Sequence, residues 1–322
     1  MATVTDDKTM VVVGPRTASG LGFALVSAIT FGLSGALARG LLDTGWSPGA
    51  VVLVRIGLAA LVVAPFGVVA LRGRWHVLRR SAGIVVGYGL LAVAGAQFCY
   101  FSAVQHMQVG PALLIEYTAP AAVVVWLWLR QGQRPGAVTL LGAGLAAVGL
   151  VLVLDVVSGA SVNVPGVLWS LAAMVGASAY FLISADESTG IPPITLAGGG
   201  LVVGAAALGL LAVIGLLPME ASTTATTYAG TEVAWWVPLV ALGLVTAAVA
   251  YVTGIAAIRR LGSRVASFVA LTEVVAGVVW AWVLLDELPR PIQMVGGLLI
   301  LVGVIGVKVG EKTVVRPEPT PA

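Results

Sequence analysis

The sequence predicts an all-α integral membrane protein whose ten transmembrane helices form two inverted repeats of five helices. Three observations predict this fold class: a very apolar composition, apolar stretches of about 20 residues that recur along the chain, and a partial internal repeat. Hydrophobic residues make up 59% of the 322 residues and charged residues only 10%. Soluble domains carry about 25% charged residues, so we expect lipid to be the solvent for most of this surface.

Each apolar stretch is long enough to cross roughly 30 Å of hydrocarbon as a helix. Most of the stretches are separated by Gly and Pro residues, which interrupt helices. We expect helices at 20–41, 49–71, 82–104, 109–129, 136–154, 164–184, 193–216, 234–257, 264–285 and 292–310. They form a first repeat over 20–154 and a second over 164–310, between cytoplasmic tails at 1–19 and 311–322.

The distribution of Lys and Arg predicts the orientation, because cytoplasmic loops carry an excess of both. With the N-terminus inside, fourteen of the seventeen lie on the cytoplasmic side, Arg39 and Arg290 lie outside, and Arg55 lies within a helix. This bias favours an even number of helices, with both termini in the cytoplasm. Fourteen arginines against three lysines, with abundant Ala, Gly and Val, indicate a GC-rich bacterial genome, so the bacterial inner membrane is the expected location.

The two halves are related by a shift of 154 positions. The shift aligns residues 109–153 with 263–307, and it superposes a tryptophan pair (126 and 128 on 280 and 282), Pro135 on Pro289, Gly142 on Gly296 and Gly149 on Gly303. A repeat with an odd number of helices must cross the membrane in opposite directions in its two copies. Inverted repeats of this kind are typical of alternating access, with a binding site near the midplane.

On several loose motifs the chain resembles the drug/metabolite transporter superfamily, in particular its ten-helix EamA-type exporters. The motifs are Gly110-Pro111-Ala112-Leu113-Leu114, Tyr117-Thr118-Ala119-Pro120, Leu271-Thr272-Glu273-Val274, Leu285-Asp286-Glu287-Leu288, the Gly296 to Gly303 spacing, and Arg55. The chain departs from the family where Val274 replaces a frequent proline and where Arg130-Gln131 replaces an acidic residue. The resemblance implies a small-metabolite or amino-acid exporter, and the departures weaken any transfer of substrate specificity.

Three charged residues, Arg55, Glu116 and Glu273, are expected well within the spans. Each costs about 2.5–3.5 kcal/mol at the centre of a membrane helix, so each should face the bundle or water and have a partner. Arg55 and Glu116 lie at similar depths in helices that run the same way, which makes an ion pair between them geometrically reasonable. Such a pair could be a purely structural link, or an external gate or clamp for a charged group of the substrate.

Glu273 has no partner that the sequence reveals. A carboxyl group in apolar surroundings binds a proton readily, as a proton-coupling carboxylate must. The functional interpretation is coupling or substrate binding; the alternative is a permanently protonated side chain that hydrogen-bonds Ser, Thr or backbone.

Further polar and aromatic residues at membrane depth are candidates for the lining of a cavity: Gln97, Tyr100, Tyr117, Tyr180 and Tyr251. Gln97 and Tyr100 are three apart and therefore share a helix face. The alternative for each is a hydrogen bond between helices or a place in the interfacial belt. Pro120 removes a backbone hydrogen bond in mid-helix and is a candidate hinge.

Enzyme, metal and cofactor sites are not expected. The sequence has no Walker loop, its two histidines lie at helix ends, and its single cysteine, Cys99, excludes an internal disulfide. We therefore expect a secondary transporter that exports a small metabolite such as an amino acid by alternating access, with protons as a candidate coupling ion and membrane lipid as its surroundings. A nucleic-acid partner is not expected. The alternatives are an uptake permease, a lipid-carrier flippase, or a membrane scaffold without transport.

Overall fold

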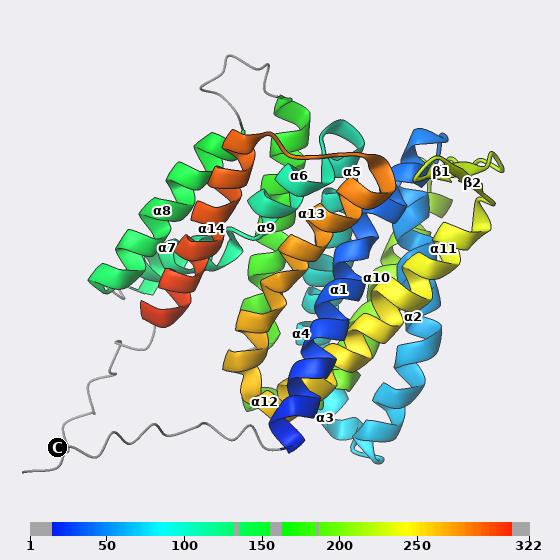
Figure 1. Ribbon diagram of the computed structural model, residues 1–322. Coiled ribbons are helices and arrows are strands. Elements are labelled where there is room, and N and C mark those ends of the chain that lie inside the picture. Colours follow the sequence, from blue (N-terminus) through cyan, green and yellow to red (C-terminus); the bar gives the residue numbers. More distant parts are fainter. Residues whose placement is uncertain (1–14, 132–134, 155–162, 185–186, 311–322) are drawn as a thin grey trace, which may run out of the picture.

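A computed structural model describes residues 15–131, 135–154, 163–184 and 187–310 as a bundle of helices (Figure 1). The helices of the first half are α1 (Pro15–Asp43), α2 (Pro48–Leu71), α3 (Trp75–Arg80), α4 (Ala82–Gly87), η1 (Tyr88–Gly95), α5 (Ala96–His106), α6 (Val109–Glu116), α7 (Ala119–Gln131) and α8 (Ala137–Val153). Those of the second half are α9 (Val164–Ser184), η3 (Glu187–Thr189), α10 (Pro193–Val213), α11 (Trp236–Gly243), η4 (Leu244–Val249), α12 (Ala250–Ala270), α13 (Thr272–Leu285) and α14 (Pro291–Gly310).

Eight of the described helical segments are long and apolar enough to cross a membrane. They are Ala18–Asp43, Pro48–Leu71, Ala82–His106, Val109–Arg130, Val164–Ser184, Pro193–Val213, Trp236–Ala257 and Pro291–Gly310. The expected fifth and ninth helices correspond to the shorter apolar helices Ala137–Val153 and Thr272–Leu285. The ninth is short because the helical conformation breaks at Leu271, between α12 and α13.

One local prediction needs correction. Helix α12 continues through residues 258–263, which we expected to connect two helices. Two Arg and one Leu among these six residues are strong helix formers.

A short hairpin accompanies the helices of this mostly helical chain. Strands β1 (Thr226–Tyr228) and β2 (Thr231–Val233) pair antiparallel outside the spans. Ala229 and Gly230 between them both have positive φ, which fits a tight two-residue hairpin turn.

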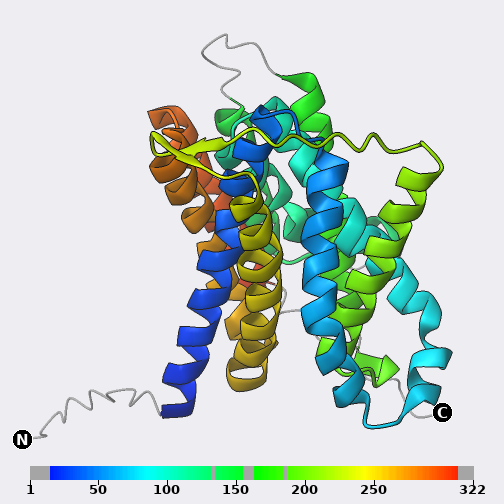
Figure 2. The same cartoon turned by 90° about the vertical axis from the view of Figure 1, so that its right-hand side faces the viewer.

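The hairpin defines one end of the bundle, which we call the hairpin face. The segment between α10 and β1 crosses this face like a strap (Figure 2). It is fastened to the α1–α2 connection, where Trp46 Nε1 donates to Ser222 O at 2.8 Å and Ser47 Oγ donates to Pro218 O at 2.8 Å. The start of α1 and the end of α14 both point away from the hairpin face, toward the opposite end of the bundle, which we call the terminal face (Figure 1).

Helices α8 and α14 form a closely packed pair on one side of the bundle (Figure 1). A Cβ added to Gly142 would lie 2.6 Å from Gly303 O, and one added to Gly149 would lie 2.5 Å from Gly296 O. Glycine is needed at these positions because the backbones of the two helices come this close. The shift of 154 residues maps Gly142 on Gly296 and Gly149 on Gly303, so it exchanges the two contacts. The contacts are therefore reciprocal, as they are across a two-fold axis.

The tightest packing lies in the half of the bundle next to the hairpin face. There the end of α1, the start of α2, the end of α5 and nearly all of α6 are buried. Leu41, Val52, Phe101 and Ile115 are among the side chains with almost no exposed surface. This packing separates the hairpin face from the charged residues at the middle of the helices.

Candidate functional site

Two helices are interrupted at matching places in the two halves. Between α6 and α7 the helix breaks at Tyr117 and Thr118; between α12 and α13 it breaks at Leu271. The shift of 154 residues superposes Tyr117 on Leu271. The local cause in the first half is Pro120, which lacks a backbone N–H, together with the Thr118 hydroxyl, which donates to Ile115 O at 2.7 Å. Helix α6 also packs against α13, so the two breaks belong to one region.

Each break lies beside one of the two glutamates at membrane depth. Glu116 is the last residue of α6, and Glu273 is in the first turn of α13. Both side chains keep part of their surface exposed and lie within electrostatic range of each other. The Tyr117 hydroxyl interacts with the Glu273 carboxyl group. A residue at the break between α6 and α7 therefore contacts a residue beside the break between α12 and α13.

The aromatic candidates gather around the same carboxyl groups. Tyr180 of α9 and Tyr251 of α12 lie within electrostatic range of Glu273, and Tyr100 of α5 lies within range of both glutamates. The Tyr251 ring also meets Phe31 of α1 edge-on, with ring centroids 5.2 Å apart. Side chains from α1, α5, α6, α9, α12 and α13 therefore converge on one centre.

Arg55 is built into the wall of this centre. Its side chain is only 2% exposed. Nη1 donates to Gln97 Oε1 at 2.5 Å, Nη2 donates to Thr246 O at 3.2 Å, and the guanidinium lies 5.2 Å from the centre of the Phe101 ring. Thr246 and Phe101 were not among the predicted site residues; nothing in the sequence marks a carbonyl oxygen or one more apolar ring as an arginine partner.

The ion pair between Arg55 and Glu116, which the sequence made geometrically reasonable but did not decide, is not formed among the described residues. Among the described residues, the ion pair within 4.0 Å is Arg39 with Asp43. The reason is that Gln97 on α5 and the Thr246 carbonyl on η4 occupy the guanidinium from two sides. Both partners lie in or next to the wide-turn segments η1 and η4, and π-type turns of this kind are frequent at functional sites.

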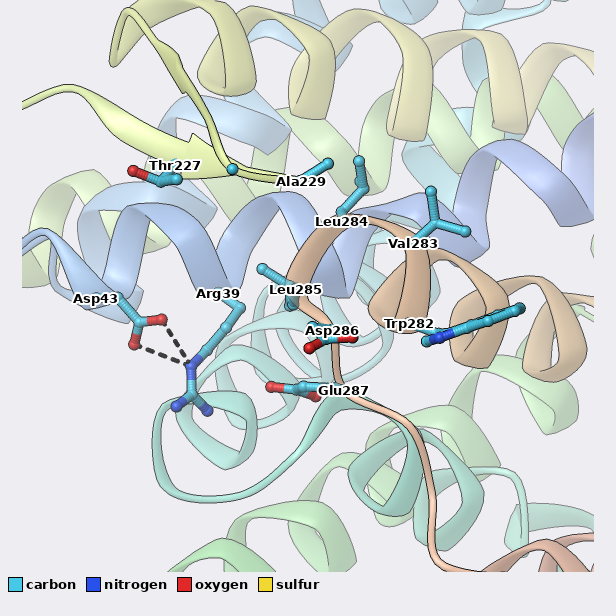
Figure 3. A pocket seen from close by; sticks show the side chains of 11 residues that line it. Arg39, Asp43, Thr227, Ala229, Trp282, Val283, Leu284, Leu285, Asp286 and Glu287 are labelled. Atoms are coloured by element: carbon cyan, nitrogen blue, oxygen red, sulfur yellow. Dashed lines mark hydrogen bonds and ion pairs between the residues drawn. The ribbon is translucent and has the colours of Figure 1, made fainter.

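The hairpin face carries a second, polar cluster, drawn in Figure 3. A shallow pocket there is lined by Arg39, Asp43, Thr227, Ala229, Gly230 and the segment Trp282–Glu287. The Arg39 guanidinium is paired with Asp43 and also donates to Val104 O at 2.8 Å. One carboxylate oxygen of Glu287 accepts from the Val109 backbone N–H at 3.0 Å. This cluster was not predicted as a site, because the residues that line the pocket come from three separate segments of the chain.

The two halves of the chain each match the same protein family. The EamA-like transporter family matches residues 18–155 and again residues 164–309. The chain belongs to the EamA-like transporter family. Its resemblance to drug/metabolite transporters is therefore confirmed, and this EamA-like protein is a multi-pass membrane transporter of that type.

Comparison with solved structures agrees with the fold. One of them, described only as the crystal structure of a protein, has 20% sequence identity and a TM-score of 0.58, covering 91% of this chain and 97% of the other. At that identity the likeness concerns the fold alone. No curated protein matches this EamA-like chain.

Proposed function

We propose that this chain is a secondary transporter that exports a small metabolite with an amino group, such as an amino acid, by alternating access. In this proposal ten helices cross the bacterial inner membrane as two inverted repeats of five, and both termini lie in the cytoplasm. The observation that carries it is the meeting of two interrupted helices beside two partly exposed glutamates. Interrupted helices near the midplane are typical of the binding sites of secondary transporters.

The charges favour recognition of an amino group. Glu116 and Glu273 retain exposed surface, whereas the guanidinium of Arg55 is buried and occupied by Gln97 and the Thr246 carbonyl. A substrate would therefore meet two carboxyl groups before it meets a cation. Tyr117, Tyr180 and Tyr251 offer rings and hydroxyl groups around Glu273, and aromatic rings attract organic cations.

Protons are the proposed coupling ion, with Glu273 as the coupling residue. A carboxyl group that can bind either a proton or an amino group exchanges one for the other, and such exchange couples export to proton entry. Tyr117 supports this role because its hydroxyl interacts with Glu273 and sits at the break of the partner helix. Pro120 next to that break is the proposed hinge, because the helix there lacks one backbone hydrogen bond.

Counterflow in proteoliposomes tests the function. Vesicles preloaded with unlabelled amino acids, nucleosides or sugars should accumulate the labelled form of one class, with saturation. A matched set with one ring then tests recognition: phenethylamine and phenylalanine should compete with the substrate, whereas 3-phenylpropionate should not. Glu116→Gln and Glu273→Gln should each weaken competition, and Glu232→Gln on the exposed hairpin serves as the control. A membrane scaffold would show no saturable counterflow with any of the three classes.

A further inference from the structure

The hairpin face of the bundle is closed by direct bonds between helix ends. Glu287 follows the end of α13, in the second half that matches the family, and Val109 begins α6, in the first half. Their hydrogen bond, 3.0 Å from Val109 N to Glu287 Oε2, joins the two halves at this face. The Val109 N–H is one of the donors that a helix start leaves without a partner inside the helix, so the carboxylate fills a vacant position and meets the positive end of the helix.

Neighbouring bonds hold the same region. Arg39 at the end of α1 donates to Val104 O and to Met107 O, at 2.8 and 3.3 Å, and so fastens the end of α5 next to Val109. The hairpin adds two bonds: Ala229 N donates to Leu284 O at 2.8 Å, and the Tyr228 hydroxyl donates to Leu37 O at 2.7 Å. In this set the Glu287 bond differs, because it directly ties α6 to the end of α13.

Beneath the Glu287 bond, α6 is the wall that separates this face from the glutamates. Its residues Val109 to Ile115 are all buried, and Val109, Ala112 and Ile115 have no exposed surface. The wall is continued by Phe101 and Val104 of α5, which also have none. A molecule that passed between α6 and α13, from Glu116 to the hairpin face, would require α6 to move away from α13, and that movement breaks the Glu287–Val109 bond.

We propose that the hydrogen bond from Val109 to Glu287 is the latch that keeps the hairpin face closed during the transport cycle. This inference rests on the alternating access proposed above. The latch acts through an acceptor at position 287 and a donor at position 109. A glutamine at 287 therefore preserves it, and loss of either partner opens the face.

The chain's single cysteine is a natural reporter. Cys99 is a free thiol, half-buried in α5, within electrostatic range of Glu116. It lies five residues before Val104, so it is below the closed wall when viewed from the hairpin face. A membrane-impermeant maleimide applied from that face should reach Cys99 only when the wall opens. A second reporter shows which membrane preparation presents this face to the reagent. It is the variant Thr223→Cys in a Cys99→Ala background, because Thr223 is exposed on the strap and its cysteine should be labelled whenever the reagent has access to the hairpin face.

The experiment compares four variants in such a preparation. Glu287→Ala should increase the rate of Cys99 labelling about tenfold, the factor expected for loss of one charge-assisted hydrogen bond. Glu287→Gln should label as slowly as the unchanged protein. Asp286→Asn is the matched control, because it removes a neighbouring charge in the same pocket without touching the bond to α6.

Val109→Pro removes the donor while leaving Glu287 intact. Proline is well suited to the first position of a helix, and the preceding Gln108 already has the extended conformation that proline requires (φ −59°, ψ 149°). This variant should label as fast as Glu287→Ala, and it keeps the test valid if Glu287→Ala folds poorly. Slow labelling of both variants, or fast labelling of Asp286→Asn, overturns the latch. Counterflow by the unchanged protein separately decides the proposed function.

Discussion

The guanidinium group of Arg55 binds the side-chain oxygen of Gln97, not the carboxyl group of Glu116. The distance from Arg55 Nη1 to Gln97 Oε1 is 2.5 Å, and Arg55 Nη2 donates to the Thr246 carbonyl oxygen. The arginine is thereby held in the wall of the site, within electrostatic range of both glutamates, and among the described residues it forms no ion pair with either of them. This relationship decides which charge a substrate would meet, and it is directly testable.

Gln97→Leu should destabilise the protein by about 2 kcal/mol, because it takes a partner from a buried charged group. Gln97→Glu should keep an acceptor for Arg55 and cost less. The measurement is the midpoint of thermal unfolding in detergent. Gln105→Leu is the matched control, since Gln105 is exposed on the same helix; an equal loss in both leucine variants would contradict the role of Gln97.

Glu273→Gln should abolish transport driven by an imposed pH gradient, because the amide cannot release or bind the coupling proton. Uptake into vesicles with and without the gradient measures this effect. Glu232→Gln should leave the gradient effect intact. If the Glu273 variant retains both its transport rate and its pH dependence, Glu273 is not the coupling residue.

Pro120→Ala should slow turnover several-fold while substrate binding is retained. Alanine supplies the N–H that proline lacks, so it can complete a helical bond to the Glu116 carbonyl and stiffen the break. Rates of counterflow and the affinity in a binding assay separate the two effects. Pro193→Ala, at the first residue of the uninterrupted α10, is the control. Unchanged turnover in Pro120→Ala would argue against a hinge.

Gly142→Ala and Gly303→Ala should each weaken the α8–α14 pair by about 1–3 kcal/mol, the usual cost of overpacking. The added Cβ would lie 2.5–2.6 Å from backbone atoms of the facing helix, and backbone atoms cannot move aside as a flexible side chain can. Unfolding midpoints measure the loss. Gly144→Ala on the same helix meets nothing within 4 Å and should be harmless.

Acid at the hairpin face should favour its closed state. Burial raises the pKa of Glu287 above its ordinary value and outweighs the opposing effects of the Val109 bond and of Arg39, while Asp43 raises the pKa further. Two other titratable groups are close to Glu287: Tyr100 lies within electrostatic range of it, and Asp286 precedes it in the chain. If an open state exposes Glu287 and restores its ordinary pKa, the closed state binds the proton more tightly. Closure then strengthens as pH falls and weakens as pH rises through the raised pKa.

The measurement is the rate of Cys99 labelling from the hairpin face over a pH series. Thiol reactivity itself varies with pH, so each rate is divided by that of the exposed Thr223→Cys reporter. The corrected rate should rise with pH in the unchanged protein and stay flat in Glu287→Gln. A rise in both proteins would assign the pH effect to another group.

Much of the candidate site was predictable one residue at a time. A charged or polar residue in a long apolar stretch is conspicuous, because lipid offers it no hydrogen bonds. For this reason Arg55, Glu116, Glu273, Gln97 and the tyrosines could be selected. Their partners could not be predicted. The acceptor of Arg55 is the Thr246 carbonyl oxygen, and the donor to Glu287 is the Val109 N–H. Both are backbone groups that nearly every residue has, so the sequence does not distinguish them.

The sequence by itself determined that the chain is a helical membrane protein, where its apolar helices lie, and that its halves are related. Those properties follow from the apolar composition, the length of the apolar stretches and the repeat, all of which can be read directly from the order of the residues. Only the tertiary structure decided that the helix breaks beside α6 and α13 lie in one region, that Arg55 binds Gln97, and that Glu287 accepts a hydrogen bond from the Val109 N–H. Such contacts depend on the packing of helices distant in sequence, and in lipid that packing is set by shape and hydrogen bonding, not by an apolar pattern.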